Sequence, residues 1–99
     1  MPRINGKASA FCDSKVKYKC TPYGNYKGGY GCIAANPERI EPGTKIKVYN
    51  AGTDELIYEG IMCDDCGKAK RVKYLLVDVW LPDEETCKNW GVKDVIIEY

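Results

Sequence analysis

The chain has 99 residues, of which 29% are charged and 44% hydrophobic, and it contains no histidine. A chain of this length forms one domain, predicted here over residues 1–99, and buries only about two thirds of the surface that it exposes when unfolded. Without histidine, neither a Ser/His triad nor a Cys/His pair can be built within the chain. No stretch approaches the roughly 20 apolar residues of a membrane helix, so no membrane partner is expected.

The charges are unevenly distributed although their sum is only +1. Residues 1–35 carry six basic groups and one acidic group, whereas residues 36–99 carry nine and thirteen. A basic first third would suit nucleic acid, but no recognised nucleic-acid motif accompanies it. We therefore expect no nucleic-acid partner and interpret the early lysines as a solvated loop.

Hydrophobic alternation over Ile4–Phe11 predicts a first strand, and a long loop rich in glycine and tyrosine follows at about residues 13–31. Loops of this length in small domains are usually functional or held by disulfides. Tyr23, Tyr26 and Tyr30 offer aromatic faces to a sugar or peptide ligand, and we include them as candidate binding residues. The alternative is that they only cover one end of the domain, because tyrosine is often partly buried.

After this loop the sequence predicts further short strands, one short helix and turns marked by glycine and proline. Acidic residues suit the start of the helix, and Gly91 suits its end. The predicted strands are Cys32–Ala35, Lys45–Tyr49, Leu56–Met62, Tyr74–Val79 and a closing strand over 92–97, with the helix at Asp83–Trp90. Many short strands with one short helix and no repeat indicate a small all-β barrel.

An even set of cysteines can supply up to three disulfides, which would place the protein in an oxidising compartment. The six are Cys12, Cys20, Cys32, Cys63, Cys66 and Cys87. Fifteen pairings exist, and Cys12 with Cys20 is the local pair that we favour. Zinc is an alternative because Cys63 and Cys66 have knuckle spacing, but a second close pair is missing. Reduced thiols in a cytosolic or phage-borne protein are the third option.

The run from residue 77 to residue 99 sets one carboxylate, Asp78, among hydrophobic residues on a predicted strand. Burial beside apolar side chains raises the pKa of a carboxyl group and makes it a proton donor near neutral pH. The alternative is a carboxylate hydrogen-bonded to backbone amides inside the barrel, without a catalytic role. Asp78 is our leading candidate for chemistry.

Three segments carry a family resemblance: GCIAANPERIEPGTKIKVYN, then YEGIMCDDCGKA, then VDVWLPDEETCKNWGVKDVIIEY. In this order they resemble the three-aspartate domain of bacterial cell-wall proteins, which is related to the catalytic domain of membrane-bound lytic transglycosylase A. The resemblance covers roughly residues 6–99, and its last segment is the most specific. It implies a six-stranded double-psi β-barrel with one short helix, in an extracellular or cell-wall location.

The resemblance also assigns candidate catalytic residues. The first family aspartate matches Asn36 in this chain, which is a departure, because an amide carries no negative charge. The second matches Asp65, with Asp64 as an alternative register, and the third matches Asp78. In the lytic transglycosylase this third position is the catalytic acid and base.

The resemblance implies cleavage of the β-1,4 bond between N-acetylmuramic acid and N-acetylglucosamine in peptidoglycan glycan strands. We include Asn36, Lys68 and Trp80 among the candidate substrate-binding residues, although a tryptophan in a thin core is more often a packing anchor. The sequence contains neither a P-loop nor a dinucleotide fingerprint, and no cofactor is expected. The rival hypothesis is a non-catalytic barrel of the same fold that binds glycan or protein.

Overall fold

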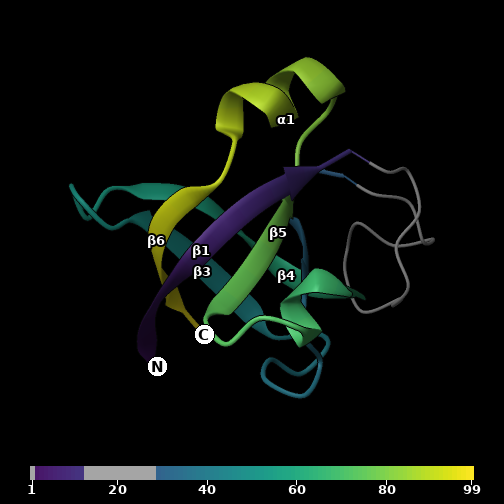
Figure 1. Cartoon of the computed structure of the whole chain (residues 1–99), viewed down its shortest axis with the longest axis vertical. Helices are drawn as coiled ribbons and strands as arrows, with labels where there is room; N and C mark the ends of the chain where they lie inside the picture. Colours follow the sequence, from purple (N-terminus) through teal and green to yellow (C-terminus); the bar gives the residue numbers. More distant parts are fainter. Residues whose placement is uncertain (1, 13–28) are drawn as a thin grey trace.

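The computed structural model describes residues 2–12 and 29–99, which form a closed six-stranded β-barrel with one short α-helix (Figure 1). The strands are β1 (Arg3–Phe11), β2 (Cys32–Ala35), β3 (Lys45–Asn50), β4 (Leu56–Asp65), β5 (Leu75–Trp80) and β6 (Lys93–Glu98). The helices are the 3-10 helix η1 (Lys68–Lys70) and α1 (Glu84–Trp90). The predicted all-β barrel is confirmed, and so is each predicted strand and the helix. Only η1, inside a predicted loop, is an addition.

The order of strands around the barrel is β1-β5-β2-β4-β3-β6. The pairs β1–β5 and β2–β4 are parallel, and the other four are antiparallel. If the labels β1, β2 and β3 are exchanged with β4, β5 and β6, the set of neighbouring strand pairs stays the same. Each half of the chain therefore makes the same crossed connection, which is the arrangement expected of a double-psi barrel.

The barrel interior is filled by the side chains that alternate inward along the strands. This core is mostly β-branched and aliphatic, which suits a pleated, buried surface. Its fully buried members with the largest side chains include Tyr58, Ile33, Ile40, Ile46, Met62, Leu75 and Ile97. Residues with the opposite parity face outward.

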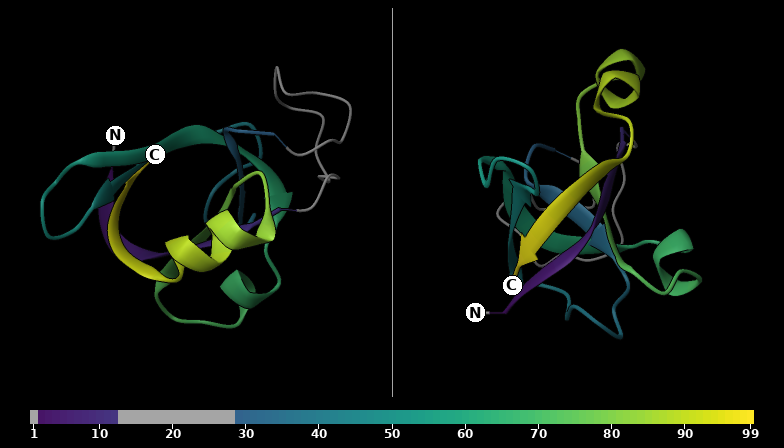
Figure 2. Two further views of the ribbon diagram at one scale, coloured as in Figure 1. Left: turned by 90° about the horizontal axis from the view of Figure 1, so that it is seen from above. Right: turned by 60° about the vertical axis from the view of Figure 1, so that its left-hand side comes forward.

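The helix α1 lies outside one end of the barrel (Figure 2). It starts at Asp83, whose carboxylate accepts hydrogen bonds from the Thr86 amide at 2.8 Å and from the Thr86 hydroxyl at 2.7 Å. It ends at Gly91, which has the positive φ of 65° that favours glycine. The Trp90 indole donates a hydrogen bond to the Ala8 carbonyl at 3.1 Å, so the helix is held on β1. No helix in the described part of the chain is long and apolar enough to cross a membrane.

The two ends of the described chain lie side by side (Figure 1). Strands β1 and β6 pair in antiparallel orientation, with Arg3 opposite Glu98. Beyond the ladder, the Tyr99 amide donates a hydrogen bond to the Pro2 carbonyl at 3.1 Å.

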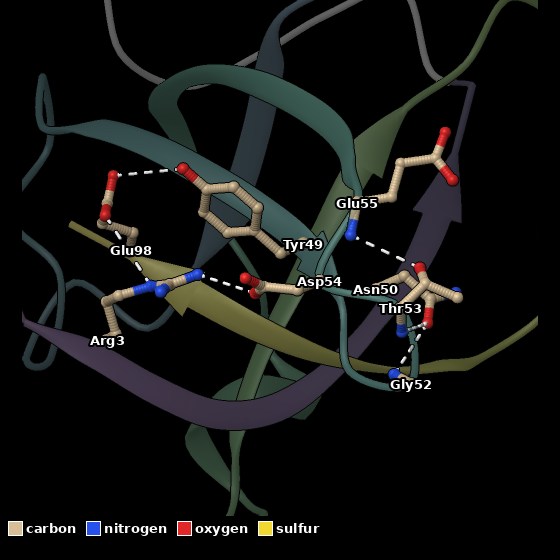
Figure 3. Close-up of polar contacts among 8 residues, drawn as sticks. All are labelled: Arg3, Tyr49, Asn50, Gly52, Thr53, Asp54, Glu55 and Glu98. Carbon is tan, nitrogen blue, oxygen red and sulfur yellow. Dashed lines mark hydrogen bonds and ion pairs between the residues drawn. The ribbon is translucent and has the colours of Figure 1, made fainter.

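A polar cluster ties these ends to the turn between β3 and β4 (Figure 3). The Arg3 guanidinium lies 2.9 Å from an Asp54 carboxylate oxygen and 3.8 Å from a Glu98 oxygen, and it covers the Tyr49 ring at 4.6 Å. Asp54 has a φ of 60°, an uncommon conformation for a residue with a side chain. The guanidinium therefore connects three parts of the chain at this end of the barrel.

Candidate functional site

Asp78 lies on the outer face of β5. Its neighbours Val77 and Val79 are both 0% exposed in the barrel core, so alternation turns the Asp78 side chain outward. The side chain is half-buried, and the Ser9 hydroxyl on β1 donates a hydrogen bond to its carboxylate at 3.0 Å. The apolar residues that flank Asp78 in the sequence thus face the opposite side of the strand. The Asp78 carboxylate therefore does not point into the barrel, as one of our alternatives required.

Asp64 shares this outer row with Asp78. Ala34 on β2 is opposite Asp78 on one side and opposite Asp64 on the other. Since neighbouring strands lie about 4.8 Å apart, the two aspartate backbones are separated by roughly 10 Å with one alanine between them. Asp65 belongs to the next row, opposite Ala35, whose side chain is in the core. Of the two registers that the resemblance allows, Asp64 is the one in line with Asp78.

Asp65 and Lys68 belong to the segment that leaves β4. The Asp65 carboxylate is 18% exposed and pairs with the Lys70 ammonium at 3.6 Å. The Asp65 amide donates to the Asp64 carboxylate at 2.9 Å, which orients the Asp64 side chain. Lys68 is exposed in η1, close to the Cys66 thiol, and η1 projects from the side of the barrel (Figure 2). A cationic segment therefore borders the acidic row.

Asn36, at the position of the first family aspartate, has a local structural role. It directly follows β2 and is 8% exposed. Its side-chain oxygen accepts a hydrogen bond from the Glu38 amide at 3.0 Å, and its carbonyl accepts from the Arg39 and Ile40 amides at 2.9 and 3.0 Å. Such a side chain stabilises the turn that begins at a residue of this type. In the sequence, the pair Asn36 and Pro37 indicated this turn.

The aromatic candidates separate into three groups. Tyr23 and Tyr26 lie outside the described residues. Tyr30 is 58% exposed, and its ring centroid is 4.7 Å from that of buried Tyr58. Trp80 is half-buried on the outer face of β5, where it packs with Phe11 against a pair of buried cysteines.

Sequence reasoning missed Ser9 and Tyr58. Ser9 is the only residue with a hydroxyl group in the run Ile4–Phe11. This polar residue among apolar neighbours is what could have marked it in the sequence. The Tyr58 hydroxyl accepts from the Gly31 amide at 2.7 Å and donates to the Trp80 carbonyl at 2.7 Å. Burial raises the pKa of the Tyr58 phenol.

Several thiols lie near the acidic row. Burial raises the pKa of the Cys66 thiol, and the Asp78 charge raises it further. Burial also raises the pKa of Cys87, with the Cys12 thiol as the next cause and Asp78 after it. Conversely, a hydrogen bond from the Cys63 thiol lowers the pKa of Cys32 to about 7. The fold has gathered cysteines from distant parts of the chain around these carboxylates.

The predicted disulfides are not formed in the described residues. Cys12 carries a free thiol, so the predicted local pair with Cys20 is wrong for this structure, and Cys20 itself lies outside the described residues. The physical reason is that Cys12 lies against Cys87 on α1 instead. Within residues 2–12 and 29–99, no group of three or more cysteine or acidic side chains is arranged to hold a metal ion.

The fold and the site together define a small double-psi barrel with an outward row of carboxylates that is bordered by lysines. No family model, curated protein or solved structure matches the chain. A functional assignment consequently depends on the chemistry of this row and on the sequence resemblance.

Proposed function

We propose that this chain is a peptidoglycan-active domain of the three-aspartate type, which cleaves the β-1,4 bond after N-acetylmuramic acid as a lytic transglycosylase. The observation that carries the proposal is the shared outer row of Asp78 and Asp64, with only Ala34 between them. Of these two carboxyl groups on one face of the barrel, Asp78 serves as the proton donor and Asp64 as a fixed negative charge. The family resemblance of the three sequence segments supports the same assignment.

In the proposed reaction Asp78 makes both proton transfers. Its carboxyl proton moves to the glycosidic oxygen while the bond from that oxygen to C1 of the muramic acid breaks. The resulting carboxylate then takes the proton of the 6-hydroxyl of the same sugar, whose oxygen bonds to C1. The products are a 1,6-anhydro sugar and a free 4-hydroxyl, so no water is consumed. The second carboxylate of a hydrolase, which activates water, is therefore unnecessary.

The neighbouring residues have supporting roles in this scheme. The negative charge of Asp64 offsets the positive charge that develops on the sugar ring. The Ser9 hydroxyl, 3.0 Å from the Asp78 carboxylate, holds that group in one orientation. In this scheme Lys68 on η1 pairs with an acidic peptide stem, and Trp80 on β5 contacts a sugar ring. The reaction as written needs no cofactor, and its substrate places the protein outside the cell or at the cell wall.

The test is digestion of purified peptidoglycan, with mass analysis of the released fragments. Wild type should release anhydromuramyl products, and Asp78→Asn should lose about 10² to 10⁴-fold in rate, which is the range of general acid–base catalysis. Asp94→Asn is the matched control, because Asp94 is an exposed strand aspartate paired with Lys7 at 2.8 Å. Circular dichroism establishes that both variants are folded. Equal rates for the wild type and a folded Asp78→Asn variant would refute the proposal.

A glycan-binding or protein-binding module is the second candidate, and the Asn36 turn favours it. The amide that replaces the first family aspartate is held by the Glu38 backbone and supplies no charge. The exposed ring of Tyr30, which is tilted against the Tyr58 ring, provides an aromatic face for a sugar. Under this alternative, peptidoglycan strands remain intact while the protein sediments with them, and Tyr30→Ala lowers the bound fraction.

A further inference from the structure

Cys12 and Cys87 come from opposite ends of the chain and meet beside the carboxyl end of β1. Cys12 directly follows Phe11, and the Phe11 carbonyl accepts a hydrogen bond from the Leu81 amide at 2.9 Å, just before α1. Cys87 lies on the side of α1 that packs on the barrel core. The Cys12 side chain also acts directly on the Cys87 thiol, and after burial its charge and a side-chain hydrogen bond are the next causes that raise the pKa of Cys87. The two thiols are therefore already in contact in the reduced protein.

Cys32 and Cys63 form a second pair on adjacent strands. Both are 0% exposed, and they pack against each other beneath Phe11 and Trp80. The ladder between β2 and β4 shifts by one residue at this point, so Cys63 is the extra residue between those paired with Ile33 and Ala34. A hydrogen bond from Cys63 stabilises the Cys32 thiolate and lowers the pKa of Cys32 to about 7. A thiolate is the form of cysteine that attacks a disulfide.

We propose that oxidation links these cysteines as Cys12–Cys87 and Cys32–Cys63, and not as sequence neighbours. The oxidant is a small-molecule disulfide such as oxidised glutathione. One cysteine thiolate attacks it and releases one glutathione thiolate, and the partner thiol then displaces the second glutathione. Two protein thiols and one glutathione disulfide become one protein disulfide and two reduced glutathiones. The inference is independent of glycan cleavage.

The two links would restrain the elements that carry the acidic row without occupying it. The first fastens α1 to the end of β1, near Ser9. The second fastens β2 to β4, next to Ala34 and Asp64. Cys12 and Cys87 are half-buried, whereas the other pair is sealed, so the first pair is the one that a reagent reaches in the folded protein. Oxidation should thus proceed in a fixed order.

The experiment uses the full chain, refolded from denaturant in a buffer of oxidised and reduced glutathione so that the buried pair is also reachable. Digestion without reduction uses trypsin and a protease that cleaves before aspartate, which separates Cys63 from Cys66. Peptide 8–12 should be linked to peptide 83–88, and the Cys32 peptide 28–39 should be linked to the fragment that ends at Cys63. A link from Cys12 to Cys20, a link from Cys63 to Cys66, or alkylation of all six thiols would overturn the proposal.

Variants test the first link separately. Oxidised wild type should melt roughly 10 °C or more above the reduced protein, because a disulfide that closes a long loop restricts the unfolded chain. Cys12→Ser should lose part of this rise and leave Cys87 open to alkylation. Cys66→Ser, the matched control, should keep both links. A Cys12→Ser variant with the whole rise would overturn the Cys12–Cys87 link.

Discussion

Replacing Tyr58 by phenylalanine removes one hydroxyl group and leaves the ring in place. The tyrosine is 2% exposed, and its ring contacts Tyr30 at 4.7 Å and the Trp90 ring at 6.2 Å between centroids. These ring contacts are the same in phenylalanine. The hydroxyl, however, joins two chain segments, since it accepts from the Gly31 amide and donates to the Trp80 carbonyl, each at 2.7 Å. The substitution therefore isolates the contribution of these two hydrogen bonds.

The expected loss follows from the groups left behind. Gly31 is buried, so its amide loses its partner at a cost of about 1–3 kcal/mol, the penalty for an unsatisfied buried donor. The lost bond to the Trp80 carbonyl adds about 1 kcal/mol, because that carbonyl keeps a second lone pair for other donors. Together the free energy of unfolding should fall by about 2–4 kcal/mol. For a domain of this size that corresponds to a decrease in Tm of roughly 10–25 °C.

Urea denaturation followed by circular dichroism measures this loss. The Tyr58→Phe midpoint should decrease at an unchanged m-value, and the Gly31 amide should exchange with solvent faster than in wild type. Tyr74→Phe is the matched control, because Tyr74 is 38% exposed and should change stability by no more than about 0.5 kcal/mol. If Tyr58→Phe were within that same margin of wild type, the hydroxyl would not join the two segments and the reasoning would be refuted.

Other changes have equally defined outcomes. Gly60→Ala should prevent folding or destabilise it severely in a thermal melt, because a Cβ at Gly60 would overlap the Gly31 carbonyl; an unchanged melt would show that the two backbones are farther apart. Asp83→Ala should lower Tm, since it removes the cap that bonds Thr86, and it should flatten the acid side of the pH–stability profile. The hydrogen bonds from Thr86 lower the pKa of Asp83 below 3.8. The cap therefore stabilises the folded state fully above pH 3.8, and this stabilisation is lost as pH falls from 3.8 through the lower pKa of the folded state. Burial raises the pKa of Tyr58 above 10, so the contribution of Tyr58 to stability is complete below pH 10 and is lost as pH rises above 10. The alkaline limb of the pH–stability profile, measured by urea midpoints, should therefore become shallower in Tyr58→Phe.

Local patterns were sufficient for the elements of the fold. Strand β2 was predicted with its observed bounds, Cys32–Ala35, because turn residues limit it on both sides. The helix was predicted from its acidic start and its glycine end. Strand β4 continues three residues beyond its predicted end, to Asp65, since its ladder with β2 extends past Met62. Pairing between parallel strands has no local signal, so the double-psi fold was expected only from the resemblance, and no strand order was predicted.

The candidate site was harder to predict, because its geometry depends on pairing between distant strands. The sequence marked Asp78, but its apolar neighbours did not say which face of β5 it occupies. The choice between Asp64 and Asp65 depends on the irregular register between β2 and β4, which no spacing along the chain encodes. Proximity along the chain favoured Cys12 with Cys20, whereas the barrel brings Cys12 to Cys87.

The hydrogen bond between the Tyr99 amide and the Pro2 carbonyl has a consequence for engineering. Because these two residues are adjacent in space, a host protein can receive the whole barrel within one of its surface loops through two short spacers. For the same reason a circular permutant is accessible, with the old ends fused and new ones opened between Gly52 and Thr53, outside every strand. Such a permutant retains all six strand pairings, although its order of elements is changed.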